Sequence, residues 1–178
     1  MNDVIVEYGG ALSDLAFEEN REDAVLESVR AVKRAISDAP EYIKFLSAPN
    51  IAIGEKLSAI DEAFGGVDAY VKNFVKIMVE RGYASSITDC FDEFTRLYYA
   101  KKNISVARVL CAAELDEAQK ATLKAKLEKK TGKTVELECV LSPEIIGGIR
   151  ILIDGELFDG SIKGRLDGLR EQLAKTTI

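Results

Sequence analysis

The stretch IIGGIRILIDGELFDGSIKGRLDGLREQL, residues 145–173, decides the fold of the second half of the chain. Its isoleucines recur at every second position from 149 to 153, which is the period of a β-strand. Asp154-Gly155 follows, and this pair is typical of a type I′ hairpin turn because both central residues of that turn need a positive φ. A short return strand is therefore expected at residues 156–158.

Beyond the hairpin the sequence predicts a helix that begins near Ser161, because serine is a favoured residue at helix N-termini. Apolar residues then recur at i, i+4, i+7 and i+11, which makes one continuous stripe along a helix. The stripe consists of Ile162, Leu166, Leu169 and Leu173. Hairpin and helix together predict a compact α+β unit at this end of the chain.

The residues before the hairpin complete that unit with a strand at 104–111, a charged amphipathic helix at 114–130 and a half-buried strand at 134–141. In the last strand, Cys139 falls on the apolar side of the alternation. It is therefore expected to be a buried small side chain rather than a reactive thiol. The three cysteines are odd in number and far apart, so we expect no disulfide framework, and a reducing compartment fits.

Residues 1–103 show helical periodicity throughout, in six amphipathic segments with short connections. The change of pattern at Asn103 predicts an N-terminal all-α six-helix bundle, residues 1–103, and a small C-terminal α/β (α+β) domain, residues 104–178. In the fifth segment, Tyr70 and Ile77 lie about 100° from the core stripe. They either widen the core or line a groove for a partner helix.

Composition excludes several functions. The net charge of −6 comes entirely from residues 1–103, which would repel a phosphate backbone, so no nucleic-acid partner is expected. No run of residues approaches the roughly 20 apolar positions of a membrane span, and no targeting segment is expected at the N-terminus. The chain has no histidine and no phosphate-binding glycine loop. We therefore expect no catalytic residue, no cofactor and no metal.

A resemblance to a known family spans nearly the whole chain. Pro143, Gly147-Gly148 and the run 159–161 before the leucine-bearing helix resemble the C-terminal signature of the delta subunits of F-type ATP synthases. The mitochondrial oligomycin-sensitivity-conferring protein belongs to this family. The first half resembles it at Tyr8, residues 11–16, Phe45-Leu46, Pro49, Lys56, residues 73–78 and Gly82. Ser142, where the family usually has an acidic residue, and the order Asp154-Gly155 depart from its pattern.

This resemblance implies a non-catalytic stator subunit, a monomer within a complex on the cytoplasmic face of the bacterial membrane, which it meets only through that complex. Its N-terminal bundle would bind the N-terminal helix of an alpha subunit. The residues implied for that contact are Tyr8, Ala11, Leu12, Leu15, Tyr70, Asn73 and Ile77. The C-terminal domain would bind the b subunits of the peripheral stalk.

The stalk contact is expected on the last predicted helix, at Ile162, Gly164, Leu166 and Gly168. The glycines either let a second helix approach closely or mark an exposed helix of low propensity. Two other functions are alternatives to the stator subunit. One is a small acidic enzyme that uses carboxylates, against which the missing histidine and nucleophile motifs count. The other is a free-standing helical adaptor.

Overall fold

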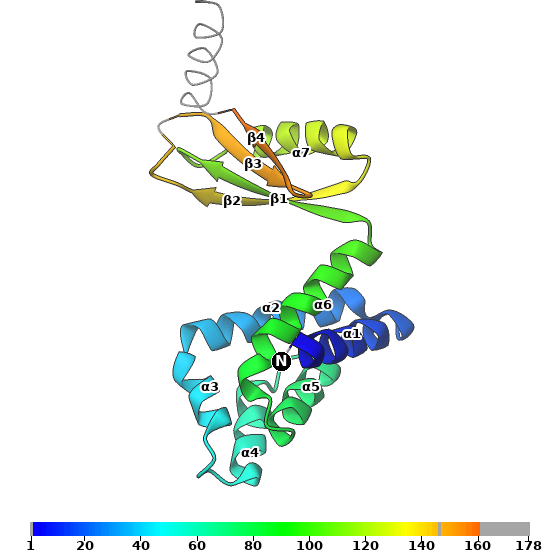
Figure 1. Cartoon of the computed structure of the whole chain (residues 1–178), viewed down its shortest axis with the longest axis vertical. Coiled ribbons are helices and arrows are strands. Elements are labelled where there is room, and N and C mark those ends of the chain that lie inside the picture. The colour runs from blue at the N-terminus through cyan, green and yellow to red at the C-terminus, as the bar shows by residue number, and fades with distance from the viewer. Residues whose placement is uncertain (1, 146, 161–178) are drawn as a thin grey trace, which may run out of the picture. The chain divides into compact units, whose positions relative to one another are not determined.

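The computed structural model describes residues 2–145 and 147–160 (Figure 1). The chain divides into two compact units, Met1–Tyr98 and Tyr99–Ile178. The helix predicted after Ser161 lies outside the described residues, and with it lie Ile162, Gly164, Leu166 and Gly168.

The first unit is helical, which confirms the predicted helical character of the N-terminal part. Its elements are α1 (Asn2–Glu18), α2 (Glu22–Asp38), α3 (Pro40–Ser47), α4 (Ile53–Ala63), α5 (Ala69–Glu80), the 3₁₀ turn η1 (Ala84–Ser86) and α6 (Ile87–Lys101). Local chemistry sets several of their ends. Pro40 takes the first position of α3, and the Asp68 carboxylate caps α5 by accepting from the Tyr70 backbone N–H. The packing of these helices as one six-helix bundle stays a prediction.

The core of the helical unit is dense and partly aromatic. Phe91 and Phe94 of α6 are fully buried, and the Phe74 ring of α5 lies 5.4 Å from the Phe91 ring between centroids. Helix α1 comes very close to α6 at Gly9, where an added Cβ would lie 2.8 Å from the Cys90 carbonyl oxygen. Only a glycine allows this approach without a shift of the backbone.

The described residues of the second unit form a four-stranded sheet and one helix, which match the four strands and the first of the two helices that the sequence predicts. These elements are β1 (Ile104–Cys111), α7 (Glu117–Thr131), β2 (Thr134–Leu141), β3 (Ile149–Ile153) and β4 (Glu156–Asp159). The strand order is β2-β1-β3-β4, with β1 parallel to β2 and the other pairs antiparallel. Helix α7 is the crossover that a parallel strand pair requires. Asp154 and Gly155 have φ values of 48° and 83°, so the predicted type I′ turn is confirmed.

Helix α7 covers one face of this sheet. Leu127 of α7 packs with the side chains of that face, which are Ala107, Val109, Cys111, Val135, Ile151 and Ile153. Cys139 also belongs to this face, but it is exposed, so the prediction of a buried Cys139 is wrong. The physical reason is the position of β2 at the edge of the sheet, where its second half from Glu138 to Leu141 is exposed throughout.

Candidate partner-binding surfaces

On α1 the predicted contact residues divide between surface and core. Tyr8, Ala11 and Leu15 follow the spacing i, i+3, i+7 and so share one helix face. Tyr8 is half-buried, Ala11 is exposed, and Leu15 remains 37% exposed. Leu12 is only 3% exposed and belongs to the core. It therefore supports the surface from below and is too buried to contact a partner directly.

On α5 the predicted residues follow the same spacing, at Tyr70, Asn73 and Ile77. Ile77 is 46% exposed and Asn73 is exposed, whereas Tyr70 is half-buried. Ile77 therefore does not widen the core, and it presents a β-branched apolar side chain to solvent.

The two helices contact each other, and aromatic contacts tie the pair at both ends. Near the start of α1, the Tyr8 ring packs edge-on against Tyr83, just beyond α5, at 6.0 Å between centroids. Just beyond α1, the Arg21 guanidinium lies 5.5 Å from the Tyr70 ring centroid and 2.6 Å from the Asp68 carboxylate. The start of each helix thus meets the end of the other, so α1 and α5 run antiparallel.

This pairing brings the two predicted stripes together. Tyr8 and Arg21 are thirteen positions apart, as are Tyr70 and Tyr83, so the two segments match in length. Leu15 and Ile77 then fall at about the same level, midway between the two ties. Leu15 and Ile77, with Tyr8 and Tyr70 near the two ties, are called the apolar strip below. Exposed apolar side chains on two neighbouring helices are what one face of an amphipathic helix can pack against.

Sequence reasoning missed Tyr83. This residue is 39% exposed and closes one end of the strip. It lies beyond the last turn of α5, where helical periodicity no longer assigns a residue to a face. The sequence feature that could have pointed to Tyr83 is Gly82 before it. A glycine with a positive φ, here 78°, ends a helix and redirects the chain.

In the second unit, the sheet face opposite α7 carries exposed apolar residues beside ion pairs. Leu152 and Leu157 face each other across β3 and β4, and they are 45% and 60% exposed. Arg150 on the same face pairs with Asp159 at 3.0 Å. The predicted stalk residues, Ile162, Gly164, Leu166 and Gly168, lie outside the described part, and this face is one candidate partner surface among the described residues.

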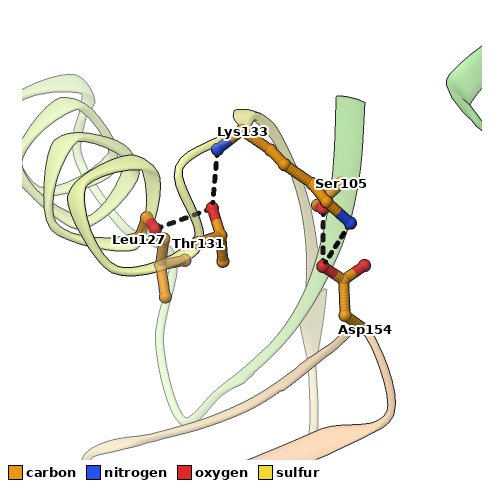
Figure 2. A network of polar contacts seen from close by, with 5 residues as sticks. All are labelled: Ser105, Leu127, Thr131, Lys133 and Asp154. Carbon is orange, nitrogen blue, oxygen red and sulfur yellow. Dashed lines mark hydrogen bonds and ion pairs between the residues drawn. The ribbon is translucent and has the colours of Figure 1, made fainter. Parts of the chain in front are cut away.

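A polar network fixes the hairpin of the second unit to its neighbours (Figure 2). The Asp154 carboxylate accepts hydrogen bonds from the buried Ser105 hydroxyl at 2.8 Å and from the Lys133 ammonium at 3.1 Å. The hydrogen bond from Ser105, and then the one from Lys133, lowers the pKa of Asp154 below its usual value. A carboxylate held ionised in this way is a poor proton donor near neutral pH, so the network serves the structure.

Two further features concern metal binding and membrane crossing within the part of the chain that the structure describes. Within residues 2–145 and 147–160, no group of three or more cysteine, aspartate or glutamate side chains could hold a metal ion. No helix in the same part of the chain is long and apolar enough to cross a membrane.

Comparison with known proteins identifies a family for this chain. Residues 4–173 match the family model for the ATP synthase delta (OSCP) subunit. The ATP synthase subunit delta of Alkaliphilus oremlandii is 33% identical over 172 residues, which cover 96% of both chains. That of Lachnoclostridium phytofermentans is 36% identical over 174 residues, covering 96% of this chain and 95% of the relative.

The fold is also similar to a solved structure. A chain in the cryo-EM structure of the Toxoplasma gondii mitochondrial ATP synthase hexamer superposes with a TM-score of 0.74 at 20% identity. The match covers 96% of this chain and 97% of that one. With the full-length family match and relatives above 30% identity, the conclusion is that this chain belongs to the ATP synthase delta (OSCP) subunit family.

Proposed function

We propose that this chain is a non-catalytic stator subunit that fastens the catalytic alpha/beta head of a bacterial ATP synthase to the b subunits of its peripheral stalk. In this proposal residues 1–103 act as a six-helix bundle that binds the N-terminal helix of an alpha subunit. Residues 104–178 bind the end of the stalk. The protein then works at the cytoplasmic face of the membrane, to which it is attached only through the complex.

The observation that carries the proposal is the apolar strip between α1 and α5. Leu15 and Ile77 are exposed there at about the same level, and the aromatic contacts of Tyr8 and Tyr70 brace the two helices at either end. A braced pair of helices changes little on binding, so little binding free energy is lost in ordering it. An amphipathic alpha helix could lay its apolar face on this strip.

The function asked of such a joint is mechanical. The head must not rotate with the rotor, or proton flow is uncoupled from ATP synthesis. A joint that resists torque works best with several contacts at once, because linked contacts give an avidity that exceeds each separate affinity. Two units that hold two different partners suit that requirement.

The first test uses a peptide with the sequence of the alpha N-terminus and two isoleucine variants. Ile77→Asp places a charge in the strip and should weaken peptide binding by about 1–3 kcal/mol, the range of interface hot-spot residues. Ile53→Asp is the matched control, because Ile53 is 48% exposed on α4, away from the strip. It should bind the peptide like the unchanged chain. Isothermal calorimetry measures both, and equal affinities for the two variants would exclude the strip as the site.

The second test addresses the stalk. Leu157→Asp changes the exposed sheet face, and Gly164→Leu changes the last predicted helix, which lies outside the described residues. Binding of a peptide that copies the C-terminal end of the stalk b subunits should be lost in at least one variant, while alpha-peptide binding is kept in both. Retention of b binding by both variants would place the stalk contact elsewhere, and loss of alpha binding would contradict the separation of roles.

A further inference from the structure

Cys111 and Cys139 lie beside each other although 28 positions separate them in the sequence. Cys111 is the last residue of β1, and Cys139 lies on the parallel neighbour β2, in register with Val109. Residues in register point to the same face of a sheet, and so do residues two apart on one strand, so both thiols lie on the face that carries α7. The Cys111 thiol donates a weak hydrogen bond at 3.5 Å to the carbonyl of Val109, the residue in register with Cys139, and both cysteines line one surface hollow.

The two sulfurs differ in their surroundings. Cys139 is exposed, whereas Cys111 is 2% exposed. Burial, and then the neighbouring Cys139, raises the pKa of the Cys111 thiol, which therefore keeps its proton. An accessible sulfur thus stands next to a protonated, sheltered one.

Both cysteines line a surface hollow of about 540 Å³ at the end of the sheet. Its other lining residues are Glu114, Leu115, Lys120, Val140 and Leu141. The pKa of Lys120 is raised, mainly by its hydrogen bond to Glu117 at 2.7 Å and in smaller part by the charges of Cys139 and Glu114. The Lys120 side chain lines the same hollow as Cys139, and the hollow has ample room for a small oxidant.

We propose that Cys139 and Cys111 form a peroxide-responsive thiol pair, in which Cys139 is oxidised first and Cys111 then resolves it to a disulfide. The oxidant is a small hydroperoxide, such as hydrogen peroxide. This site is independent of the proposed stator role, and it matches the arrangement of redox-sensitive cysteines, an accessible thiol next to a resolving one.

The chemistry balances in two steps. The Cys139 thiolate attacks one peroxide oxygen, an S–O bond forms, the O–O bond breaks, and hydroxide leaves and takes a proton from solvent. The Cys111 sulfur then attacks the sulfenic sulfur, an S–S bond forms and the S–O bond breaks. The departing hydroxide takes the Cys111 proton and leaves as water. Sulfur has lost two electrons in total, and the peroxide has gained them.

The register implies that this disulfide is strained. Cys111 is in register with Leu141 rather than with Cys139, so the two cysteines are diagonal neighbours, and disulfides favour a closer approach of the two Cα atoms. β2 pairs with β1 as far as Leu141, and the Ser142 N–H donates to the Cys111 carbonyl at 2.9 Å, so closing the disulfide has to distort this end of the sheet. Strained disulfides are more easily reduced, so the oxidation should be reversible by a thiol reductant.

The test treats the full chain with hydrogen peroxide, blocks remaining thiols and maps tryptic peptides by mass spectrometry. Each cysteine falls in its own peptide, with Cys90 in 82–96, Cys111 in 109–120 and Cys139 in 134–150. We expect a disulfide between peptides 109–120 and 134–150 that dithiothreitol removes. Cys90 is the internal control, because burial raises its pKa to about 11. It should react at least tenfold more slowly than Cys139.

Two variants separate the roles. Cys111→Ser should leave a Cys139 sulfenic acid that dimedone traps at least tenfold more than in the unchanged chain, and Cys139→Ser should abolish the cross-link. The proposal is overturned if Cys139 and Cys90 oxidise at equal rates, or if dimedone labels Cys139 equally with and without Cys111. If Cys111→Ser does not fold, the cross-link in the unchanged chain decides the question, and its absence overturns the proposal.

Discussion

The helical unit and the sheet unit fold around very different cores. Among the twelve largest fully buried side chains of the described residues, eleven belong to the helical unit, and Val109 is the other. The helical core includes Phe91 and Phe94, whereas Phe158, the phenylalanine of the sheet unit, is only partly buried. The described sheet has a helix on one face, while the other face carries Leu152 and Leu157 in contact with solvent.

This difference teaches where each unit obtains its stability. A core rich in buried aromatic and aliphatic side chains supports a domain by itself. A unit of about 80 residues with a small core stays marginal, so polar ties and bound partners contribute a larger share. We therefore expect the helical unit to be the independent part, and the sheet unit to depend more on its network and on the stalk.

The largest expected effect tests that independence. Phe91→Ala removes a fully buried ring that packs against Phe74, and should destabilise the helical unit by about 3–5 kcal/mol. Five of the six tyrosines belong to the helical unit, and the sixth, Tyr99, lies in α6, so tyrosine fluorescence during urea unfolding follows mainly this unit. Hydrogen exchange by mass spectrometry follows the sheet. If sheet peptides lose their protection in parallel with the helices, the two units unfold together. The helical unit would then not be independent of the sheet unit.

The next effect concerns the small core. Leu127 of α7 is 6% exposed and packs on the covered face of the sheet, so Leu127→Ala should cost about 2–5 kcal/mol. A loss of this size would leave the sheet unit largely unfolded, with the helical unit intact. Hydrogen exchange of peptides from β1 and β2 is the measurement. Leu157→Ala is the control, since this exposed leucine should change stability by less than about 0.5 kcal/mol.

Two adjacent glycines of α1 differ in their surroundings. Gly9→Ala would bring a Cβ to 2.8 Å from the Cys90 carbonyl oxygen, and should destabilise the unit by about 1–3 kcal/mol through overpacking. Gly10→Ala meets no atom within 4 Å and should stabilise α1 by about 0.5–1 kcal/mol. Urea midpoints should therefore move in opposite directions. Shifts of the same sign would show that α1 and α6 are not in the close contact described.

Sequence reasoning succeeded where the signal is local. The hairpin followed from Asp154-Gly155, because turn chemistry involves neighbours in the chain. It failed where the outcome depends on tertiary position. Strand alternation correctly placed Cys139 on the sheet face that carries α7. Alternation cannot tell how far along β2 the helix covers that face, and Cys139 is exposed.

The candidate strip shows the same limit. The resemblance implied one contact surface with Tyr8, Leu12 and Leu15, and a helix stripe is broad enough to hold all three. The packing of neighbouring helices decided that Leu12 is in the core and Leu15 at the surface. The contact of Arg21 with Tyr70 joins residues 49 positions apart, and no local pattern predicts such a pair.

The smallest expected effect is the pH dependence of the hydrogen bonds that Asp154 accepts from Ser105 and Lys133. The pKa of Asp154 is lowered by hydrogen bonds from Ser105 and Lys133, so the folded value lies below the unfolded value of about 4. The ionised carboxylate therefore stabilises the sheet unit above about pH 4, and this contribution is lost as the pH falls through the folded pKa. Because the side chain is 44% exposed, solvent screening limits the contribution to a few tenths of a kcal/mol, at most about 1.

Asp154→Asn isolates the contribution of the Asp154 charge to stability. Asparagine tolerates the positive φ of the turn and keeps an oxygen that can accept a hydrogen bond from Ser105. Only the negative charge opposite Lys133 is removed. The unchanged chain should be more stable than the variant at pH 7, and the difference should shrink toward zero below about pH 3. Urea unfolding of both proteins across this range, followed by hydrogen exchange in peptides of β1 and β3, measures it. Taking the difference removes the titration of the other carboxylates, which both proteins share. A difference that is constant with pH would mean that asparagine disturbs the turn itself, and that the charge at this position does not stabilise the sheet unit.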